Sequence, residues 1–294
     1  MPGVILDGRQ ISRDIRQELR ERVMVLAGSA VVPKLAGIIV GDDAGSASYV
    51  RLKEKAAAEV GLLSEMCHLP QDYTQKDLLA RIRELNRRPD VHGIFVQLPL
   101  PPQFSESVVL AAVSPAKDVD GFHPESVGRS WLGQEAFVPA TPAGIMEMLR
   151  RSGYGDLRHR HAVIVNVDNL VGKPLAALLC QESVGADVTL CHPDTPVLAD
   201  WTRQADLLVV AANRPRFITA DMVKEGVIAV DFGTNHVKDT SAKQGYRLVG
   251  DIDFEPVREK AKAITPVPGG VGPMTVTMLL AHIVEAAERL AAIS

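Results

Sequence analysis

The chain has 294 residues, of which 46% are hydrophobic, 23% are charged and only 4% are aromatic, and its formal net charge is −4. This composition is typical of a soluble globular protein long enough for two domains, and the charge favours neither nucleic acid nor a membrane surface as a partner. Cys67, Cys180 and Cys191 fit no disulfide framework and no zinc pattern, so we expect a reducing, cytoplasmic setting and no bound metal. Because no segment reaches ~18 consecutive apolar residues, neither a signal peptide nor a membrane span is predicted.

The first part of the chain alternates helical and strand-like patterns. Apolar residues spaced three or four apart predict an amphipathic helix over residues 7–26. Short apolar runs at 35–40, near 62–69 and from 93 onward predict strands, the last of which ends in prolines that cannot continue a central sheet. Helical patterns at about 49–60 and 74–86 separate them. Strands alternating with helices predict parallel βαβ units.

The second part repeats this alternation. Residues 115–142 are rich in glycine and proline and have weak periodicity, which indicates a long functional loop or a domain boundary. A helix is predicted at 141–151, and strands are predicted at 161–165, 187–190, 207–211 and 227–231. A glycine–proline loop at 265–274 leads into a terminal helix at 275–292. We therefore predict an α/β fold with two α/β domains.

Tyr49 and Lys53 lie four residues apart on one predicted helix, so they share a face. A phenol beside an amine suits proton transfer, although a solvated helix with an extended lysine is the plainer interpretation. Gln97 closes an apolar strand, where its amide either caps the strand end or faces Lys53. A lysine enclosed there would have its pKa lowered by desolvation, which is what a general base needs.

Asp118 and Asp120 stand in a non-helical segment that ends in Gly121-Phe122-His123. Such carboxylates usually bond nearby backbone amides within a turn. The functional alternative is a carboxylate that accepts two hydrogen bonds from a heterocycle such as a pterin. The sequence leaves both interpretations open.

Residues 166–174 occupy the position of a nucleotide-binding turn between a strand and a helix, but Gly172 is the only glycine, so the segment is no Gly-x-Gly-x-x-Gly fingerprint. Free N–H groups at the helix start could hold a phosphate, Lys173 would add charge, and Pro174 suits the first helical turn. An ordinary βα loop is the alternative. His192, after the next strand, is more often structural than a ligand, and no metal-ligand spacing or Gly-x-Ser-x-Gly elbow is present.

Six stretches, taken in order, resemble the bifunctional methylenetetrahydrofolate dehydrogenase/methenyltetrahydrofolate cyclohydrolase family over essentially the full length. They are Val-Gly-Asp-Asp…Ser-Tyr-Val-Arg-Leu-Lys (40–53), Gly-Ile-Phe-Val-Gln-Leu-Pro-Leu-Pro (93–101), Lys-Asp-Val-Asp-Gly-Phe-His (117–123), Val-Gly-Lys-Pro (171–174), Gly-Asp-Ile-Asp-Phe (250–254) and Thr-Pro-Val-Pro-Gly-Gly-Val-Gly-Pro-Met-Thr (265–275).

The resemblance implies a folate-binding catalytic domain at 1–138 plus 273–294, a Rossmann-like NAD(P)-binding domain at 139–272, and an active site in the cleft between them. It also implies a cytoplasmic homodimer that interconverts 5,10-methylene-, 5,10-methenyl- and 10-formyl-tetrahydrofolate. NADP or NAD would be the cofactor, in the one-carbon metabolism that serves purine biosynthesis.

The resemblance also assigns roles to residues. It makes Lys53 the catalytic lysine, Gln97 the residue that tunes it, Tyr49 a wall of the folate ring and Asp120 the anchor of the pterin. Further substrate contacts are implied for Ser46, Leu98, Pro99, Pro268, Gly269 and Gly270. Cofactor contacts are implied for Asn166, Val167, Asp168, Val171, Gly172, Lys173, Pro174, His192, Pro193 and Thr234.

Most departures from the family pattern fall at positions for which the resemblance implies cofactor contacts. Asn166-Val167-Asp168 stands where Gly-Arg-Ser is usual, Pro193 replaces a serine, and Asn213 replaces a glycine. Smaller departures are Thr234 and Ala140. Asp168 would repel a 2′-phosphate by about 1 kcal/mol or more, which favours NAD over NADP. The alternatives are a monofunctional cyclohydrolase and a non-catalytic folate-binding relative, each with a degenerate dinucleotide site.

Overall fold

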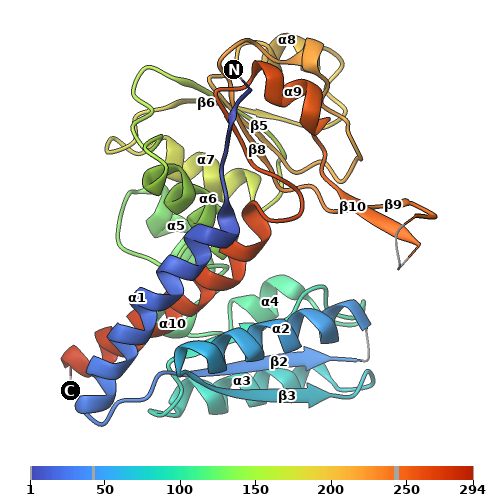
Figure 1. Ribbon diagram of the computed structural model, residues 1–294. Coiled ribbons are helices and arrows are strands. Elements are labelled where there is room, and N and C mark those ends of the chain that lie inside the picture. Colours follow the sequence, from blue (N-terminus) through green and yellow to red (C-terminus); the bar gives the residue numbers. More distant parts are fainter. Residues whose placement is uncertain (1, 42–43, 242–244, 294) are drawn as a thin grey trace. The chain divides into compact units, whose positions relative to one another are not determined.

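The computed structural model describes residues 2–41, 44–241 and 245–293, apart from the side chains at 44, 46–48 and 293. The chain forms two compact units (Figure 1). One, here the six-stranded unit, comprises the residues up to Ser12 and Thr141–Thr275. The other, the three-stranded unit, comprises Arg13–Ala140 and the residues from Val276 onward. No helix in the described ranges is long and apolar enough to span a membrane.

The three-stranded unit is built on a parallel sheet in the order β3-β2-β4. Its strands are β2 (Lys34–Val40), β3 (Leu63–Leu69) and β4 (Gly93–Val96). Its helices are α2 (Ala44–Val60), α3 (Gln75–Arg87), α4 (Glu106–Leu110), the 3₁₀ turn η1 (Pro115–Lys117), α5 (Pro124–Trp131), and most of α1 (Gly8–Gly28) and α10 (Val271–Ile293).

Side-chain alternation along the strands gives this sheet two different faces. On one face, Ile38 of β2 and Ile94 of β4 join a core with Leu78 of α3. On the other face, Phe95 of β4 lies beneath Lys53 of α2, and Gly93 approaches Ile283 of α10. Since Gln97 follows Phe95 by two residues, the alternation carries its side chain to the face that bears the lysine.

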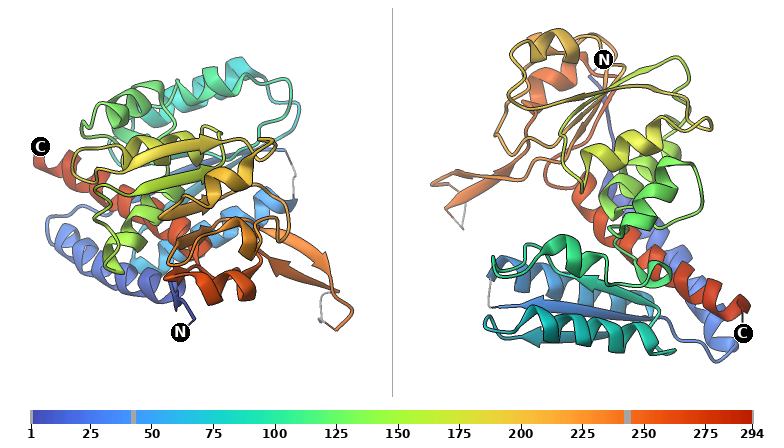
Figure 2. Two further views of the ribbon diagram at one scale, coloured as in Figure 1. Left: turned by 90° about the horizontal axis from the view of Figure 1, so that it is seen from above. Right: turned by 180° about the vertical axis from the view of Figure 1, so that it is seen from behind.

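Helices α1 and α10 lie side by side and run in the same direction (Figures 1 and 2). Arg22 of α1 forms a salt bridge with Glu288 of α10 at 2.6 Å, and Arg16 Nε donates to Thr277 Oγ1 at 3.0 Å. At the start of α1, Asp7 caps the helix by accepting from two backbone N–H groups. This pairing brings the C-terminal helix against the sheet of the three-stranded unit.

The six-stranded unit has an all-parallel sheet in the order β1-β11-β8-β7-β5-β6. Its strands are β1 (Val4–Ile5), β5 (His161–Val165), β6 (Asp187–Cys191), β7 (Leu207–Val210), β8 (Ile228–Asp231) and β11 (Ala263–Ile264). It also contains α6 (Ala140–Arg151), α7 (Gly172–Leu179), α8 (Leu198–Thr202), η2 (Ala220–Met222), α9 (Phe254–Lys260) and an antiparallel hairpin of β9 (Asn235–Lys238) and β10 (Tyr246–Val249).

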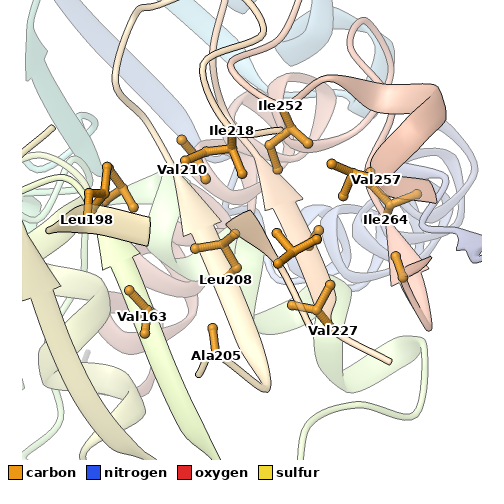
Figure 3. Packing of buried hydrophobic residues seen from close by; sticks show 14 of the residues in the cluster. Val163, Leu198, Ala205, Leu208, Val210, Ile218, Val227, Ile252, Val257 and Ile264 are labelled. Atoms are coloured by element: carbon orange, nitrogen blue, oxygen red, sulfur yellow. The ribbon is translucent and has the colours of Figure 1, made fainter. Parts of the chain in front are cut away.

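One face of this sheet forms a closely packed core (Figure 3). Val163, Leu208 and Ile264 from three strands pack with Leu198 of α8 and Val257 of α9. Helix α7 packs against β5 and β6. The strand order reverses direction between β5 and β7, so the carboxyl ends of these strands form a topological switch point, where ligands bind in open α/β sheets.

The predicted α/β class is confirmed, and the structure differs from the predicted boundaries in two places. The residues up to Ser12 were predicted with the catalytic domain, but Val4 pairs with Ala263, so β1 extends the other sheet. Two residues are too few for a period, so sequence could not reveal this strand. Residues 115–142, predicted to be a loop or a boundary, contain η1 and α5, and the unit boundary falls at their end.

Candidate functional site

Lys53 is buried on the sheet-facing side of α2, with only 6% of its surface exposed. Its amine lies 4.0 Å from the centroid of the Phe95 ring and 5.0 Å from that of Tyr49. Burial lowers the pKa of Lys53, and the negative charge of Asp120 opposes this shift. The helix that looked like a solvated surface turn therefore presents an enclosed amine, which suits a proton acceptor.

Gln97 is the polar partner of this amine. Its Nε2 donates to the carbonyl of Leu98 at 2.8 Å, which turns Oε1 toward the lysine, and Lys53 Nζ donates to that oxygen at 3.5 Å. An amide oxygen accepts from an ammonium or from a neutral amine. The predicted contact between Lys53 and Gln97 is therefore present, with the amide oxygen turned toward the amine.

Phe95 and Gly37 complete the surroundings of the amine, and sequence reasoning gave neither of them a role. They are register partners on β4 and β2. A Cβ at Gly37 would lie 2.4 Å from Phe95 Cε1, so the ring occupies space that any other residue at 37 would fill. The alternation that places Gln97 beside Lys53 could have identified Phe95 as well.

Tyr49 and Asp120 flank the lysine with a phenol and a carboxylate. Burial, together with the negative charge of Asp120, raises the pKa of Tyr49 to about 12, so the phenol keeps its proton at neutral pH. Asp120 is half-buried. The protein around its carboxylate raises the pKa of Asp120, while the charges of Lys53 and His282 oppose the shift. The set therefore holds a proton donor, an amine and a carboxylate within one small volume.

Asp118 and Asp120, two residues apart, have different environments. The Asp118 carboxylate accepts from the backbone N–H groups of Phe122 and His123 at 3.2 and 2.9 Å, and from Ser126 Oγ at 2.7 Å. Burial raises the pKa of Asp118 to about 6, against the pull of these hydrogen bonds. Asp118 thus has the turn role that the motif usually signals, and Asp120 is the carboxylate left to face Lys53.

His282 of α10 holds the segment that carries Asp120, and the sequence gave no signal for it. Its buried Nδ1 donates to the carbonyl of Val119 at 2.9 Å, and its ring centroid lies 5.5 Å from that of Phe137. Burial lowers the pKa of His282, although the bond to Val119 and the charges of Glu285 and Asp120 oppose the shift. The ring is therefore neutral at physiological pH, with the proton on Nδ1.

His282→Gln is expected to reduce the loss of stability in acid. Because burial lowers the pKa of His282 below its unfolded value, the unfolded chain binds this proton first as the pH falls. The free energy of unfolding should therefore decrease below about pH 6.5, by at most about 1.4 kcal/mol per pH unit from this group. A glutamine amide keeps a donor for Val119 and does not titrate. Denaturant unfolding of both proteins between pH 5 and 8 checks this, and parallel pH profiles would contradict it.

The remaining predicted substrate residues fall in both units. Leu98 and Pro99 follow β4 next to Gln97 in the three-stranded unit, whereas the side chain of Ser46 lies outside the described residues. Pro268, Gly269 and Gly270 belong to the six-stranded unit, where Gly269 O accepts from Arg9 N–H at 3.1 Å. Gly269 has a φ of +118°, a backbone conformation that would be strained for a residue with a side chain.

The turn after β5, predicted to bind the cofactor, is closed by its own side chains. Asn166 Oδ1 accepts from Gly172 N–H at 2.8 Å, and its Nδ2 donates to the carbonyl of Ala211 at the end of β7. Asp168 Oδ1 accepts from the N–H groups of Leu170 and Val171 at 2.9 and 2.7 Å. Asn166 therefore spans the switch point between β5 and β7.

These bonds correct one expectation. The N–H groups of Leu170, Val171 and Gly172 already have side-chain acceptors, and that of Lys173 bonds the carbonyl of Asp168 at 3.1 Å. They are therefore not free to hold a phosphate. Lys173 Nζ donates to Asn169 Oδ1 at 2.8 Å. Gly172 is required by close approach, because a Cβ would lie 2.2 Å from the carbonyl oxygen of Asn166.

The neighbouring strand ends carry further charge. After β6, His192 is exposed, and Pro193 O accepts from Arg214 Nη1 at 3.3 Å. Arg214, after β7, also forms a salt bridge with Asp194 at 2.5 Å. Sequence reasoning singled out neither member of this pair. The positive charge of Arg214 is thus already paired with the carboxylate of Asp194.

Asn213 and Thr234 are held near a buried carboxylate that sequence reasoning also missed. Asn213 has a φ of +55°, so asparagine adopts the left-handed conformation expected at this glycine position. Its N–H, with those of Ala212 and Arg214, donates to Asp251. Thr234 is exposed beside Asn235, whose Nδ2 also donates to Asp251, at 2.8 Å. Asp251 therefore fixes the loop after β7.

The described residues contain no cluster of three or more histidine, cysteine or acidic side chains that could hold a metal ion.

Comparison with known protein families matches both parts of the chain. Residues 6–120 match the tetrahydrofolate dehydrogenase/cyclohydrolase catalytic domain, and residues 139–291 match the NAD(P)-binding domain of the same family. The chain belongs to the tetrahydrofolate dehydrogenase/cyclohydrolase family. Its Lys53 site therefore lies in the family's catalytic domain, and its switch point in the family's NAD(P)-binding domain.

Individual relatives cover nearly the whole chain. The bifunctional protein FolD of Dehalococcoides mccartyi (strain CBDB1) is 51% identical over 293 residues, which cover 98% of each sequence. The bifunctional FolD methylenetetrahydrofolate dehydrogenase/cyclohydrolase of Campylobacter jejuni has a solved structure with a TM-score of 0.92 at 45% identity, covering 97% of this chain and 99% of that one. The Trypanosoma brucei FolD, solved with an NADP cofactor and an inhibitor, has a TM-score of 0.92 at 38% identity and 98% coverage of both.

Proposed function

We propose that this chain interconverts 5,10-methylene-, 5,10-methenyl- and 10-formyl-tetrahydrofolate, by dehydrogenation with a nicotinamide cofactor followed by hydrolysis. One observation carries the proposal within this family: the Lys53 amine is buried against Gln97 Oε1 and beside Asp120. Purified protein given methenyltetrahydrofolate should hydrolyse it. Given the methylene form with NAD or NADP, it should produce the reduced cofactor.

In the hydrolytic step, the neutral Lys53 amine would accept a proton from the water that attacks the methenyl carbon. The resulting ammonium would return that proton to the ring nitrogen as its bond to this carbon breaks and the five-membered ring opens. The second proton of the water would pass to solvent as the carbon–oxygen bond becomes the formyl C=O, so the hydrolysis of the cation releases one proton. Gln97 Oε1 accepts from the amine in either state, so the lysine keeps its position while its charge changes. General acid–base catalysis of this kind contributes about 10²–10⁴-fold in rate.

Asp120 and Tyr49 would position the folate. A carboxylate can accept two N–H bonds from the amidine edge of a pterin, which fixes the orientation of the ring. Tyr49 keeps its proton because its pKa is raised to about 12, so the ring of the folate would meet a neutral aromatic wall. Both steps use the same bound folate, so both depend on these contacts.

The dinucleotide would supply the hydride acceptor for the first step. The switch point between β5 and β7 is the expected position for it. The residues proposed to contact it follow the carboxyl ends of β5, β6 and β8 in the same parallel sheet: Asn166, Asp168, Gly172, His192, Pro193 and Thr234. Since the amides at the start of α7 are already bonded, we assign the contacts with the ribose to side chains in this set.

We propose that NAD is preferred over NADP. Asp168 places a carboxylate at the end of β5, and Asp194 places another at the end of β6. Arg214 already pairs with Asp194, so its charge is partly neutralised. A 2′-phosphate would be repelled by about 1 kcal/mol, whereas a ribose hydroxyl can donate to a carboxylate.

Asp168→Ser is expected to tighten NADP binding about 5-fold relative to NAD, because it removes that repulsion. Serine can still accept from the N–H groups of Leu170 and Val171, so the turn should persist. Dissociation constants of both cofactors, measured for both proteins, check the change. The matched control is Asp187→Ser, which removes the same charge at the opposite end of β6. A wild-type protein that binds NADP clearly more tightly than NAD would contradict the preference.

One observation favours a second candidate, a monofunctional cyclohydrolase: the backbone N–H groups before α7 donate to the side chains of Asn166 and Asp168 in the same turn. Assays with NAD and NADP in separate reactions decide between the two. Hydride transfer to either cofactor excludes the monofunctional candidate, and hydrolysis without any hydride transfer establishes it.

The proposal extends to a cytoplasmic homodimer in the one-carbon metabolism that serves purine synthesis. The three cysteines are free thiols, which suits a reducing compartment. The expectation of a dimer rests on the family resemblance, and sedimentation equilibrium of the purified protein tests it.

A further inference from the structure

We propose that Phe95 is a positioning residue for Lys53: its ring face supports the amine, and Gly37 leaves the room that the ring requires. This inference rests on the catalytic role proposed above for the lysine. It assigns a tuning function to a side chain that otherwise counts as an ordinary core residue, 1% exposed.

The geometry is that of a cation over an aromatic face. Lys53 Nζ lies 4.0 Å from the Phe95 centroid, well within the ~6 Å over which such contacts are favourable. Its other polar contact, to Gln97 Oε1, is long at 3.5 Å. The amine thus lies over the ring in addition to its long hydrogen bond, and the negative face of the ring favours the ammonium over the neutral form.

Gly37 explains why the ring can lie there. A Cβ at 37 would approach Phe95 Cε1 and Cζ at 2.4 and 2.5 Å, and Met66 Sδ at 2.4 Å. Such distances are far below van der Waals contact, so a side chain at 37 would displace the ring. The sheet therefore has no side chain at position 37, and the Phe95 ring that lies under the amine occupies that space.

The Phe95 ring and the Asp120 carboxylate oppose the effect of burial on the protonation of Lys53. Lys53 faces Asp120 from the segment after η1, and Asp120 in turn faces His282 from α10, while Tyr49 on the same helix is a protonated phenol. Burial favours the neutral amine, whereas Asp120 and the Phe95 face favour the ammonium. A balance between these effects would let the lysine both accept and return a proton within one reaction.

The test is the pH at which the Lys53 amine titrates in the wild type and in Phe95→Leu. The Cε–Hε NMR signals of protein labelled with ¹³C-lysine report it, and the Lys53 signal is assigned by its absence from Lys53→Met. Leucine keeps the site apolar but removes the ring face. We expect the midpoint to fall by about 0.4 to 1.5 pH units, and the pH limb of cyclohydrolase activity to move in the same direction.

Two further variants make the test specific. Phe104→Leu removes a buried ring from the core on the other face of the sheet and should leave the Lys53 midpoint unchanged. Placing pentafluorophenylalanine at position 95 keeps the shape of the ring but reverses its charge distribution. It should lower the midpoint at least as much as leucine does, and it serves if Phe95→Leu does not fold.

An unchanged midpoint in folded Phe95→Leu or in the fluorinated protein would overturn the proposal and reduce Phe95 to a core residue. The readout is independent of the proposed function. If Lys53→Met keeps its cyclohydrolase activity, the catalytic assignment fails, while the titration midpoint still reports whether Phe95 holds the amine.

Discussion

Lys53→Met is expected to lower the cyclohydrolase rate by about 10²–10⁴-fold, the contribution of a positioned acid–base group. Methionine has nearly the length of lysine and an apolar end, so it should occupy the buried space over Phe95 without a stranded charge. The free energy of unfolding should therefore stay the same or rise. Hydride transfer should fall much less, because that step depends on positioning and not on the amine.

The matched control is Lys55→Met, which removes an exposed lysine two residues further along α2. It should leave both activities within about 2-fold of wild type, as is usual for surface substitutions. Rates of both reactions and denaturant unfolding curves, measured on all three proteins, separate catalysis from folding. Activity of Lys53→Met close to wild type would remove the lysine from the mechanism.

Asp120→Asn is expected to lower kcat/KM about 10- to 100-fold in both reactions, because both would use the folate that this carboxylate is proposed to anchor. Losing one charge-assisted hydrogen bond costs about 1.5–3 kcal/mol of binding. Stability should be unchanged or higher, since the protein around Asp120 already disfavours its charge and raises its pKa. Steady-state kinetics with each substrate, together with unfolding curves, measure both effects.

Asp118→Asn is the contrasting variant, two residues away. The Asp118 carboxylate satisfies the N–H groups of Phe122 and His123 and the hydroxyl of Ser126, and an amide can accept on only one of its two ends. One buried donor would lose its acceptor, which costs about 1–3 kcal/mol of stability. Activity per folded molecule should persist. If the two variants exchanged these effects, the roles given to the two aspartates would be wrong.

Much of the fold could be predicted because its signals are local and repeated. The apolar runs at β2, β5 and β7 are long enough to show strands covered on both faces, and the helices between them impose parallel pairing. Strands β1 and β11 have two residues each and carry no period. They exist because Val4 and Ala263 meet across the chain, which no local pattern shows.

The residues of the candidate site likewise divide into those that a local sequence pattern indicates and those that only the fold reveals. Tyr49 and Lys53 were paired by helical spacing, and Gln97 by its place at a strand end. Phe95 lies on the same face of β4 by simple alternation, but its role appears only when the amine is seen over the ring. His282 contacts Val119 across 163 residues of sequence, so only the fold could reveal it.

The turn at Asn166–Asp168 shows the limit of assigning roles by resemblance. Its departures from the family pattern suggested a lost phosphate contact and a repulsive charge. The structure adds that both side chains accept backbone N–H groups of their own turn, so they also hold the start of α7. Residue type indicated the charge, but the hydrogen bonds depend on the close approach of Gly172 to Asn166.

The central claim is that one bound folate passes from hydride loss to hydrolysis at Lys53. The most direct test follows methylenetetrahydrofolate with NAD, and separately with NADP, in the wild type and in Lys53→Met. With the cofactor that is used, we expect the wild type to yield 10-formyltetrahydrofolate with an equal amount of reduced cofactor. We expect the variant to yield the reduced cofactor while methenyltetrahydrofolate accumulates. Equal rates of formyl product from both proteins, above the uncatalysed hydrolysis, would contradict the account.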